Sequence, residues 1–180
     1  CFLVFFQLMF QARYLMIKKR YKKFGWCFSI QGFSGSGKTS IAKNILKDIE
    51  KLFGKTVRLD GDNLRSFLKT AGYSKGYSKL ERGKYNYPIC ELINLFLNAN
   101  INIIYTWVGL NHKGNKILKK KIKNLINILI KTNIEDAKKN KKHVYRLKKN
   151  IVGIDISPDF PKNSNIVIKN DFKRPIKTLS

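Results

Sequence analysis

Between Gly32 and Ser40 the chain reads GFSGSGKTS, a short stretch rich in glycines and hydroxyl side chains with one lysine. The spacing is G-x-x-x-x-G-K-[ST]. Glycines at these positions let backbone N–H groups surround a phosphate, and a following helix adds the positive end of its dipole. The lysine of such a loop reaches the β- and γ-phosphates, and the next hydroxyl can bind Mg²⁺. The sequence therefore predicts a nucleotide-phosphate site formed by Gly32, Ser34, Gly35, Ser36, Gly37, Lys38, Thr39 and Ser40.

A second polar motif, LDGDNLR, spans residues 59–65 and follows an apolar run. Ligands of an open parallel sheet bind beyond the carboxyl ends of its strands, so Asp60 and Asp62 are expected to face the phosphate loop. One carboxylate can hold Mg²⁺ through water, and the other can accept the proton of an attacking hydroxyl. Arg65, about one turn into the next helix, can clamp an anionic acceptor. The structural alternative is an Asp-Gly turn in which Asp62 caps a helix.

The elements that must position these motifs alternate between apolar runs and longer amphipathic stretches. Runs that are apolar throughout indicate strands covered on both faces, and strands that alternate with helices indicate a parallel sheet. We therefore predict one α/β domain with a P-loop NTPase-type three-layer fold, a five-stranded parallel sheet flanked by helices. The expected strands are 26–31, 56–60, 101–108, 125–131 and 165–171; the expected helices are 37–53, 63–69, 82–98 and 113–123, with 138–150 basic and irregular.

The composition favours a nucleotide-binding protein over one that recognises nucleic acid. The formal net charge is +26, but lysine far outnumbers arginine and no helix-turn-helix or RNA-binding signature accompanies it. We attribute the charge to compositional bias and attraction for anionic nucleotides, and expect the lysine-rich runs 119–123 and 138–142 to be solvated. The three cysteines, Cys1, Cys27 and Cys90, lack metal-site spacing and indicate a reducing compartment. A cytoplasmic location is therefore expected.

With these motifs in place, the chain resembles the adenylylsulfate kinases over about residues 26–171. The stretches GFSGSGKTSIA, LDGDNLR, GYSKLER, INIIYTWV and NIVGIDISPDFPKNSNIVIKND are similar to that family's motifs in order and spacing. The resemblance implies a cofactor pair of ATP and Mg²⁺ and transfer of the γ-phosphoryl group to the ribose 3′-hydroxyl of adenylylsulfate, a step of sulfate assimilation. It implies a small-molecule nucleotide as partner and leaves a homodimer open.

The resemblance also assigns roles to single residues. Asp62 would be the base, with Lys38 and Asp60 as the other catalytic residues and Thr39 and Asp60 on the metal side. Residues 141–149 would form a basic lid that closes over both nucleotides. The implied acceptor-binding residues are Arg65 and Arg82 for the phosphosulfate, Tyr77 for stacking on the base, Lys149 near the transferring phosphate, and Trp107 and Ile151 along the acceptor pocket.

Several positions depart from the family's pattern, and they fall on the acceptor side. Ile151 stands where the family has a stacking Phe, Tyr85 where it has Asn, and His112 where Arg is usual, while the lid is shorter. His112 either replaces that arginine or is a surface residue, and Trp107 is equally explained as a core aromatic. Two alternatives therefore stay open: a related kinase for another acceptor, such as cytidine diphosphoramidate in capsule synthesis, and a non-catalytic nucleotide- or nucleic-acid-binding module.

The N-terminal residues are expected to lie outside this domain. Residues 1–22 begin with an apolar run that is short for a membrane span and is interrupted by Gln7, Gln11 and Arg13. A signal peptide would carry its charges before the apolar part. We predict a non-conforming or disordered extension at 1–22, no membrane association, and a P-loop kinase domain at 23–180.

Overall fold

A five-stranded, wholly parallel sheet forms the centre of the molecule. The computed structural model of the chain describes residues 24–73, 78–146, 150–161 and 163–173, so the predicted extension at 1–22 lies outside them. The strand order β2-β3-β1-β4-β5 confirms the predicted parallel sheet. The strands are β1 Cys27–Gln31, β2 Thr56–Asp60, β3 Asn102–Trp107, β4 Leu125–Lys131 and β5 Ile166–Lys169.

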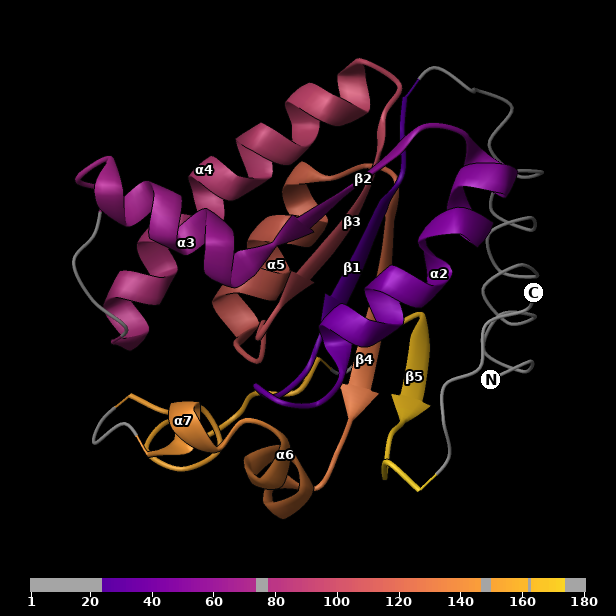
Figure 1. The fold of residues 1–180 in the computed structure, drawn as a ribbon. Coiled ribbons are helices and arrows are strands. Elements are labelled where there is room, and N and C mark those ends of the chain that lie inside the picture. The colour runs from indigo at the N-terminus through magenta and orange to yellow at the C-terminus, as the bar shows by residue number, and fades with distance from the viewer. Residues whose placement is uncertain (1–23, 74–77, 147–149, 162, 174–180) are drawn as a thin grey trace.

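Helices cover both faces of this sheet and complete the predicted three layers. Figure 1 shows α2 on one face, α4 and α5 on the other, and α6 and α7 beyond the carboxyl ends of the strands. The phosphate loop connects β1 to α2 at this same end. The helices are α2 Lys38–Phe53, α3 Gly61–Thr70, α4 Lys79–Asn98, α5 His112–Lys121, α6 Ile134–Asn140 and α7 Lys142–Tyr145.

The core lies on both sides of the three central strands, β3, β1 and β4. On one face Phe28 and Ile128 pack with Ile41 of α2, and on the other Ile103 packs with Ile93 of α4. All of these side chains are buried, and each such burial stabilises the fold by about 1.5–3 kcal/mol. The expectation of strands buried throughout is wrong for β2 and β5, whose residues are mostly half-buried or exposed. These are the edge strands, which have one neighbour each and less helical cover.

Most boundaries lie within two residues of the prediction, and two regions differ more. The segment 138–150, predicted to be irregular, contains the end of α6 and all of α7, and the side chain of Asn133 caps α6 by accepting a hydrogen bond from the N–H of Glu135. Helix α4 begins at Lys79, three residues before its predicted start. The hydroxyl of Ser78 caps α4 by accepting a hydrogen bond from the N–H of Glu81, so a Ser-x-x-Glu capping pattern sets this boundary.

The described cysteines are structural, as expected. Cys27 and Cys90 are buried and unbridged, and burial raises the pKa of the Cys90 thiol to about 11. Neither thiol is therefore ionised near neutral pH, which makes both unreactive.

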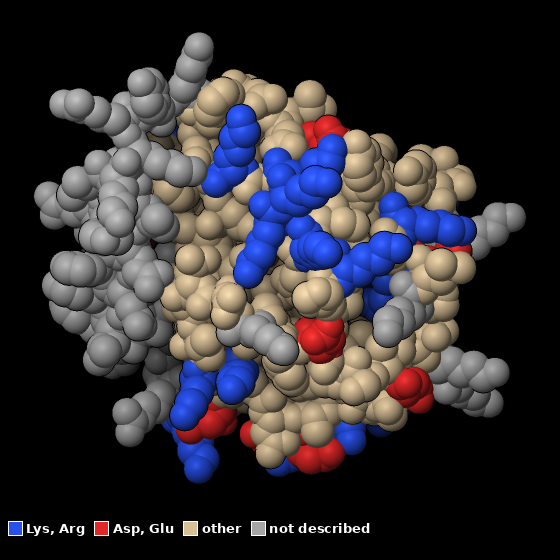
Figure 2. Space-filling view, turned by 180° about the vertical axis from the view of Figure 1, so that it is seen from behind, with Lys and Arg blue, Asp and Glu red and all other residues tan. Residues whose placement is uncertain are grey.

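The lysine-rich run 119–123, which begins in the last turn of α5, is largely solvated, as predicted. Lys119, Lys120 and Lys123 are exposed, and Figure 2 shows basic side chains gathered on the rear face, where α5 lies. Among the described helices, none is both long and apolar enough to cross a membrane. The cytoplasmic location stays a prediction.

Candidate active site

The phosphate loop ends at Gly37, which is the N-cap of α2. Gly37 has a φ of +90°, a left-handed conformation that favours glycine, and no side chain caps the helix. The first turn of α2 contains no acidic residue. The free N–H groups and the positive end of the helix dipole at this terminus therefore suit an anion.

Lys38, the first residue of α2, folds back onto the loop that precedes it. Its Nζ donates hydrogen bonds to the carbonyl oxygens of Gly32 at 3.1 Å and Phe33 at 2.6 Å. Burial of the ammonium, and next the positive charge of Lys141, lowers the pKa of Lys38 to about 7. A phosphate in the loop would favour the charged form of this lysine again.

Asp60 joins the phosphate loop to the sheet. Its Oδ2 accepts hydrogen bonds from Thr106 Oγ1 at 2.9 Å and, more weakly, from Thr39 Oγ1 at 3.4 Å. Its Oδ1 accepts one from the N–H of Asp62 at 2.9 Å, so Asp60 and not Asp62 is the N-cap of α3. The structure thus brings together Thr39 and Asp60, the two predicted metal-side residues. Hydroxyl and carboxylate oxygens are ligands that suit Mg²⁺.

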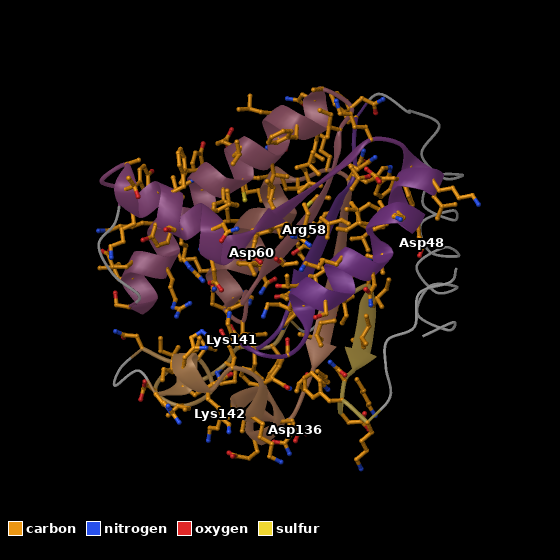
Figure 3. The ribbon with its side chains drawn as sticks, in the orientation of Figure 1. Asp48, Arg58, Asp60, Asp136, Lys141 and Lys142 are labelled. Carbon is orange, nitrogen blue, oxygen red and sulfur yellow. The ribbon has the colours of Figure 1, made fainter. Side chains whose placement is uncertain are left out.

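The other aspartate, Asp62, stands at the first turn of α3 between two cations. Its Oδ1 is ion-paired with Arg65, and its Oδ2 lies 3.6 Å from Lys141 Nζ. Asp62 lines a cavity of about 430 Å³ together with Lys38, Thr39 and Lys141. Figure 3 shows Lys141 on the side of the α6–α7 corner that faces Asp60 and the strand ends.

Sequence reasoning left the position of Lys141 open, because this residue belongs both to the predicted basic lid, 141–149, and to the run 138–142 that was expected to be solvated. Lys139 and Lys142 of that run are exposed, and Lys142 is not among the residues that line this cavity. The run itself carries no signal that separates Lys141 from the other lysines. Its position becomes apparent only when α6 and α7 are placed beyond the carboxyl ends of the strands.

A second cavity, of about 310 Å³, adjoins the first, since Trp107 and Val108 line both. Arg65, Arg82 and Trp107, three of the predicted acceptor residues, line this second cavity. Arg82 is held there by a hydrogen bond from Nη2 to the carbonyl oxygen of Asn150, at 3.2 Å. Lining residues that the sequence did not single out include Asn86, Lys113, Ser157 and Asp159.

Trp107 is buried and lines both cavities, while its role toward an acceptor stays a prediction. Its indole is buried, stacks on Tyr105 with ring centroids 5.4 Å apart, and donates a hydrogen bond from Nε1 to Ser29 Oγ at 2.8 Å. It is therefore a core aromatic that also forms a wall of both cavities. His112 is exposed at the start of α5 and lines the second cavity.

Of the remaining predicted acceptor residues, the structure describes only Ile151, which is not among the described residues that line this cavity. Ile151 is buried, and its N–H donates to Asp155 Oδ2 at 3.0 Å, while the next residue, Val152, lines the cavity. Tyr77 and Lys149 lie outside the described residues. The second cavity is lined by the cationic side chains of Arg65, Arg82 and Lys113 and by one carboxylate, Asp159, while Arg65 is also paired with Asp62. These groups together carry a net positive charge, which suits an anionic ligand.

Comparison with known proteins gives this arrangement a context. Residues 24–169 match the profile of the family described as "Adenylylsulphate kinase". An adenylyl-sulfate kinase of Thermodesulfovibrio yellowstonii is 29% identical over 154 residues, covering 81% of this chain and 76% of that protein. A cytidine diphosphoramidate kinase of Campylobacter jejuni is 24% identical over 154 residues, covering 82% of this chain and 88% of that protein.

A solved structure shows the same fold. The Mycobacterium tuberculosis APS kinase in complex with AMPPNP and APS aligns with a TM-score of 0.74 at 22% identity, over 85% of this chain and 91% of that chain. At this identity the likeness concerns the fold, and it agrees with the parallel sheet and flanking helices described above.

Proposed function

Because the chain belongs to the adenylylsulfate kinase family, we propose that it transfers the γ-phosphoryl group of ATP to the ribose 3′-hydroxyl of adenylylsulfate. Family membership makes the chain a nucleotide-dependent phosphotransferase. The identity of the acceptor and the roles of single residues are our proposal.

The position of Asp62 is the observation that carries it. Asp62 lines the cavity next to the phosphate loop, and its ion-pair partner Arg65 lines the second cavity. A carboxylate at this junction is within reach of a hydroxyl that enters from one cavity and a phosphate held in the other. General-base catalysis requires this geometry.

The chemistry follows from the two cavities. The loop amides and Lys38 hold the triphosphate, and Asp60, fixed by Thr106, orients the metal-side oxygens. Thr39 and Asp60 would hold Mg²⁺, which would supply neutralisation of the phosphate charge. Asp62 accepts the proton of the acceptor hydroxyl, and the oxygen of that hydroxyl bonds to the γ-phosphorus. The bond from phosphorus to the β,γ-bridging oxygen breaks, and ADP leaves with that electron pair.

The acceptor would lie in the second cavity. Arg65 and Arg82 would hold its phosphosulfate, because guanidinium groups pair well with such anions, and Trp107 would form a wall beside it. Tyr77 as the stacking ring, Lys149 near the transferring phosphate and Ile151 as a further acceptor residue stay predictions from the resemblance.

A second acceptor, cytidine diphosphoramidate, is favoured by the residues that depart from the family's pattern. Tyr85 and His112, two of these residues, both line the second cavity. The departures from the family's pattern do not include the phosphate loop or the two aspartates. A change of acceptor with the same donor is therefore consistent with the site.

The test compares turnover of the two acceptors with ATP by the wild-type chain. Adenylylsulfate as the better substrate, by kcat/KM, supports the first proposal, and cytidine diphosphoramidate the second. Asp62→Asn should lower kcat by about 10²–10⁴-fold while ATP still binds, because the variant removes only the base. Asp48→Asn, on the side of α2 away from both cavities, is the matched control (Figure 3). Turnover of neither acceptor would favour a non-catalytic module.

A further inference from the structure

The corner between α6 and α7 is packed directly against the phosphate loop. The hydroxyl of Tyr145 donates a hydrogen bond to the carbonyl oxygen of Ser34 at 2.8 Å. At Gly35 the two backbones approach so closely that a Cβ there would overlap the carbonyl oxygen of Ala137 and lie 3.2 Å from the Cβ of Lys141. The corner and the loop are therefore in direct contact through both a side chain and the backbone.

Lys141 occupies the turn of this corner. Its N–H closes α6 by donating to the carbonyl oxygen of Ala137, and its side chain lines the phosphate cavity. Lys142, the next residue, is exposed and lies farther from Asp60 and the strand ends (Figure 3). The fold thus separates two adjacent lysines, one directed at the phosphate cavity and one at solvent.

Two lysines, Lys38 and Lys141, and two carboxylates, Asp60 and Asp62, line this cavity, and Arg65 adds a third cation beside Asp62. Lys141 lies 3.6 Å from Asp62 Oδ2, while Arg65 pairs with the other oxygen of the same carboxylate. Lys141 also shares the cavity with Lys38, whose pKa its charge helps to lower. Two ammonium groups in one cavity repel each other until an anion enters between them. The γ-phosphate of a nucleotide in the loop is such an anion.

We propose that Lys141 is a further catalytic residue, whose ammonium leaves Asp62 and contacts the γ-phosphoryl group as it is transferred. The inference rests on the proposed phosphoryl transfer from ATP. The exchange has two effects: the developing charge on the γ-oxygens gains a cation, and Asp62 Oδ2 becomes available to the acceptor hydroxyl. No bond to Lys141 forms or breaks. The long, flexible lysine stem permits this change of partner, and the chain thereby supplies in cis the charge that other systems supply with an arginine.

The experiment compares Lys141→Met with Lys142→Met. Both variants remove one lysine charge from the same corner, and thermal melting checks that both are folded. Loss of one group that stabilises developing charge should lower kcat by about 10²-fold, with the KM for ATP changed by less than about threefold. Lys142→Met should keep its kcat within about threefold. Lys141→Arg should recover part of the activity, since it restores the charge.

A binding measurement tests the same idea without any acceptor. ADP with aluminium fluoride imitates the transferring phosphoryl group, so the wild type should bind this mixture more tightly than ADP alone. Lys141→Met should lose that difference while its affinity for ADP stays unchanged, and Lys142→Met should retain it. Equal affinities in the wild type, or a difference that survives in Lys141→Met, would overturn the proposal. If the difference behaves as expected but neither acceptor is phosphorylated, Lys141 keeps its role and the acceptor assignment falls.

Discussion

Replacing Gly35 with alanine should separate the phosphate loop from the α6–α7 corner. Gly35 has a φ of +80°, and a Cβ at this position would overlap the backbone oxygen of Ala137. The obstacle is a backbone atom at the C-terminal end of a helix, so no side-chain rotation can remove it. The corner has to move, and the interactions that Lys141 and Tyr145 make with the active site move with it.

The expected magnitude has two parts. An alanine in the left-handed region costs about 1–2 kcal/mol of stability. Relieving the overlap with Ala137 needs a shift of about 1 Å in the corner, a displacement that can lower turnover by about 10²-fold when it misplaces catalytic groups. Gly35→Ala should therefore be slightly less stable and far less active.

Gly72 offers a matched control, because it has a φ of +75° and nothing lies within 4 Å of the position of its Cβ. Gly72→Ala should show the same backbone strain, measured by urea unfolding, with no loss of phosphoryl transfer, measured by ADP release with either acceptor. The reasoning fails if Gly35→Ala keeps its turnover within about threefold of the wild type. It fails equally if both variants lose turnover alike.

Two further predictions concern Lys38 and Asn102. The pKa of Lys38 is about 7 without ligand, and a bound phosphate raises it. Nucleotide binding at pH 8.5 should therefore take up a proton, and the affinity for nucleotide should fall as the pH rises from 7. Calorimetry in buffers of different ionisation enthalpy measures both the proton uptake and the affinity. Asn102 is buried, accepts a hydrogen bond from the N–H of Trp26 and donates hydrogen bonds to three carbonyl oxygens at 53–55. Asn102→Ala should therefore lower the free energy of unfolding by about 3 kcal/mol or more in urea titrations. The control Asn98→Ala, at an exposed position, should not lower it.

The features that local sequence determines were predicted well. The phosphate loop depends on glycine spacing between one strand and one helix, and α2 starts and ends where Gly37 and Gly54 indicate. Strands β2 and β4 have their predicted boundaries for the same reason, since short apolar runs between turn residues define them. The start of α4 was available from the Ser78–Glu81 capping pattern, but that pattern overlaps a motif read for its chemistry.

Features that depend on contacts between distant segments were not available from the sequence. The carboxylate of Asp60, which caps α3, also accepts a hydrogen bond from Thr106, on a strand that is 46 residues away along the chain. The position of Lys141 at the phosphate cavity depends on packing against a loop about a hundred residues earlier. A run of lysines gives no signal of which member lies at the cavity. Periodicity and spacing report on neighbours in sequence, so such choices require the fold.

This distinction explains why the phosphate donor is easier to infer than the acceptor. A triphosphate is bound mainly by backbone amides of one continuous loop, whose sequence can be read directly. The acceptor cavity is instead made of side chains from several elements, and Arg82 is held there through Asn150, 68 residues away. Exposed members of this lining, such as His112, can change without disturbing the loop or the sheet. Asp62 lies between the donor side and the acceptor side of the site. One of its oxygens pairs with Arg65 on the acceptor side, and the other pairs with Lys141 on the donor side. Variants of these two cations should therefore affect different substrates, even though they contact the same carboxylate.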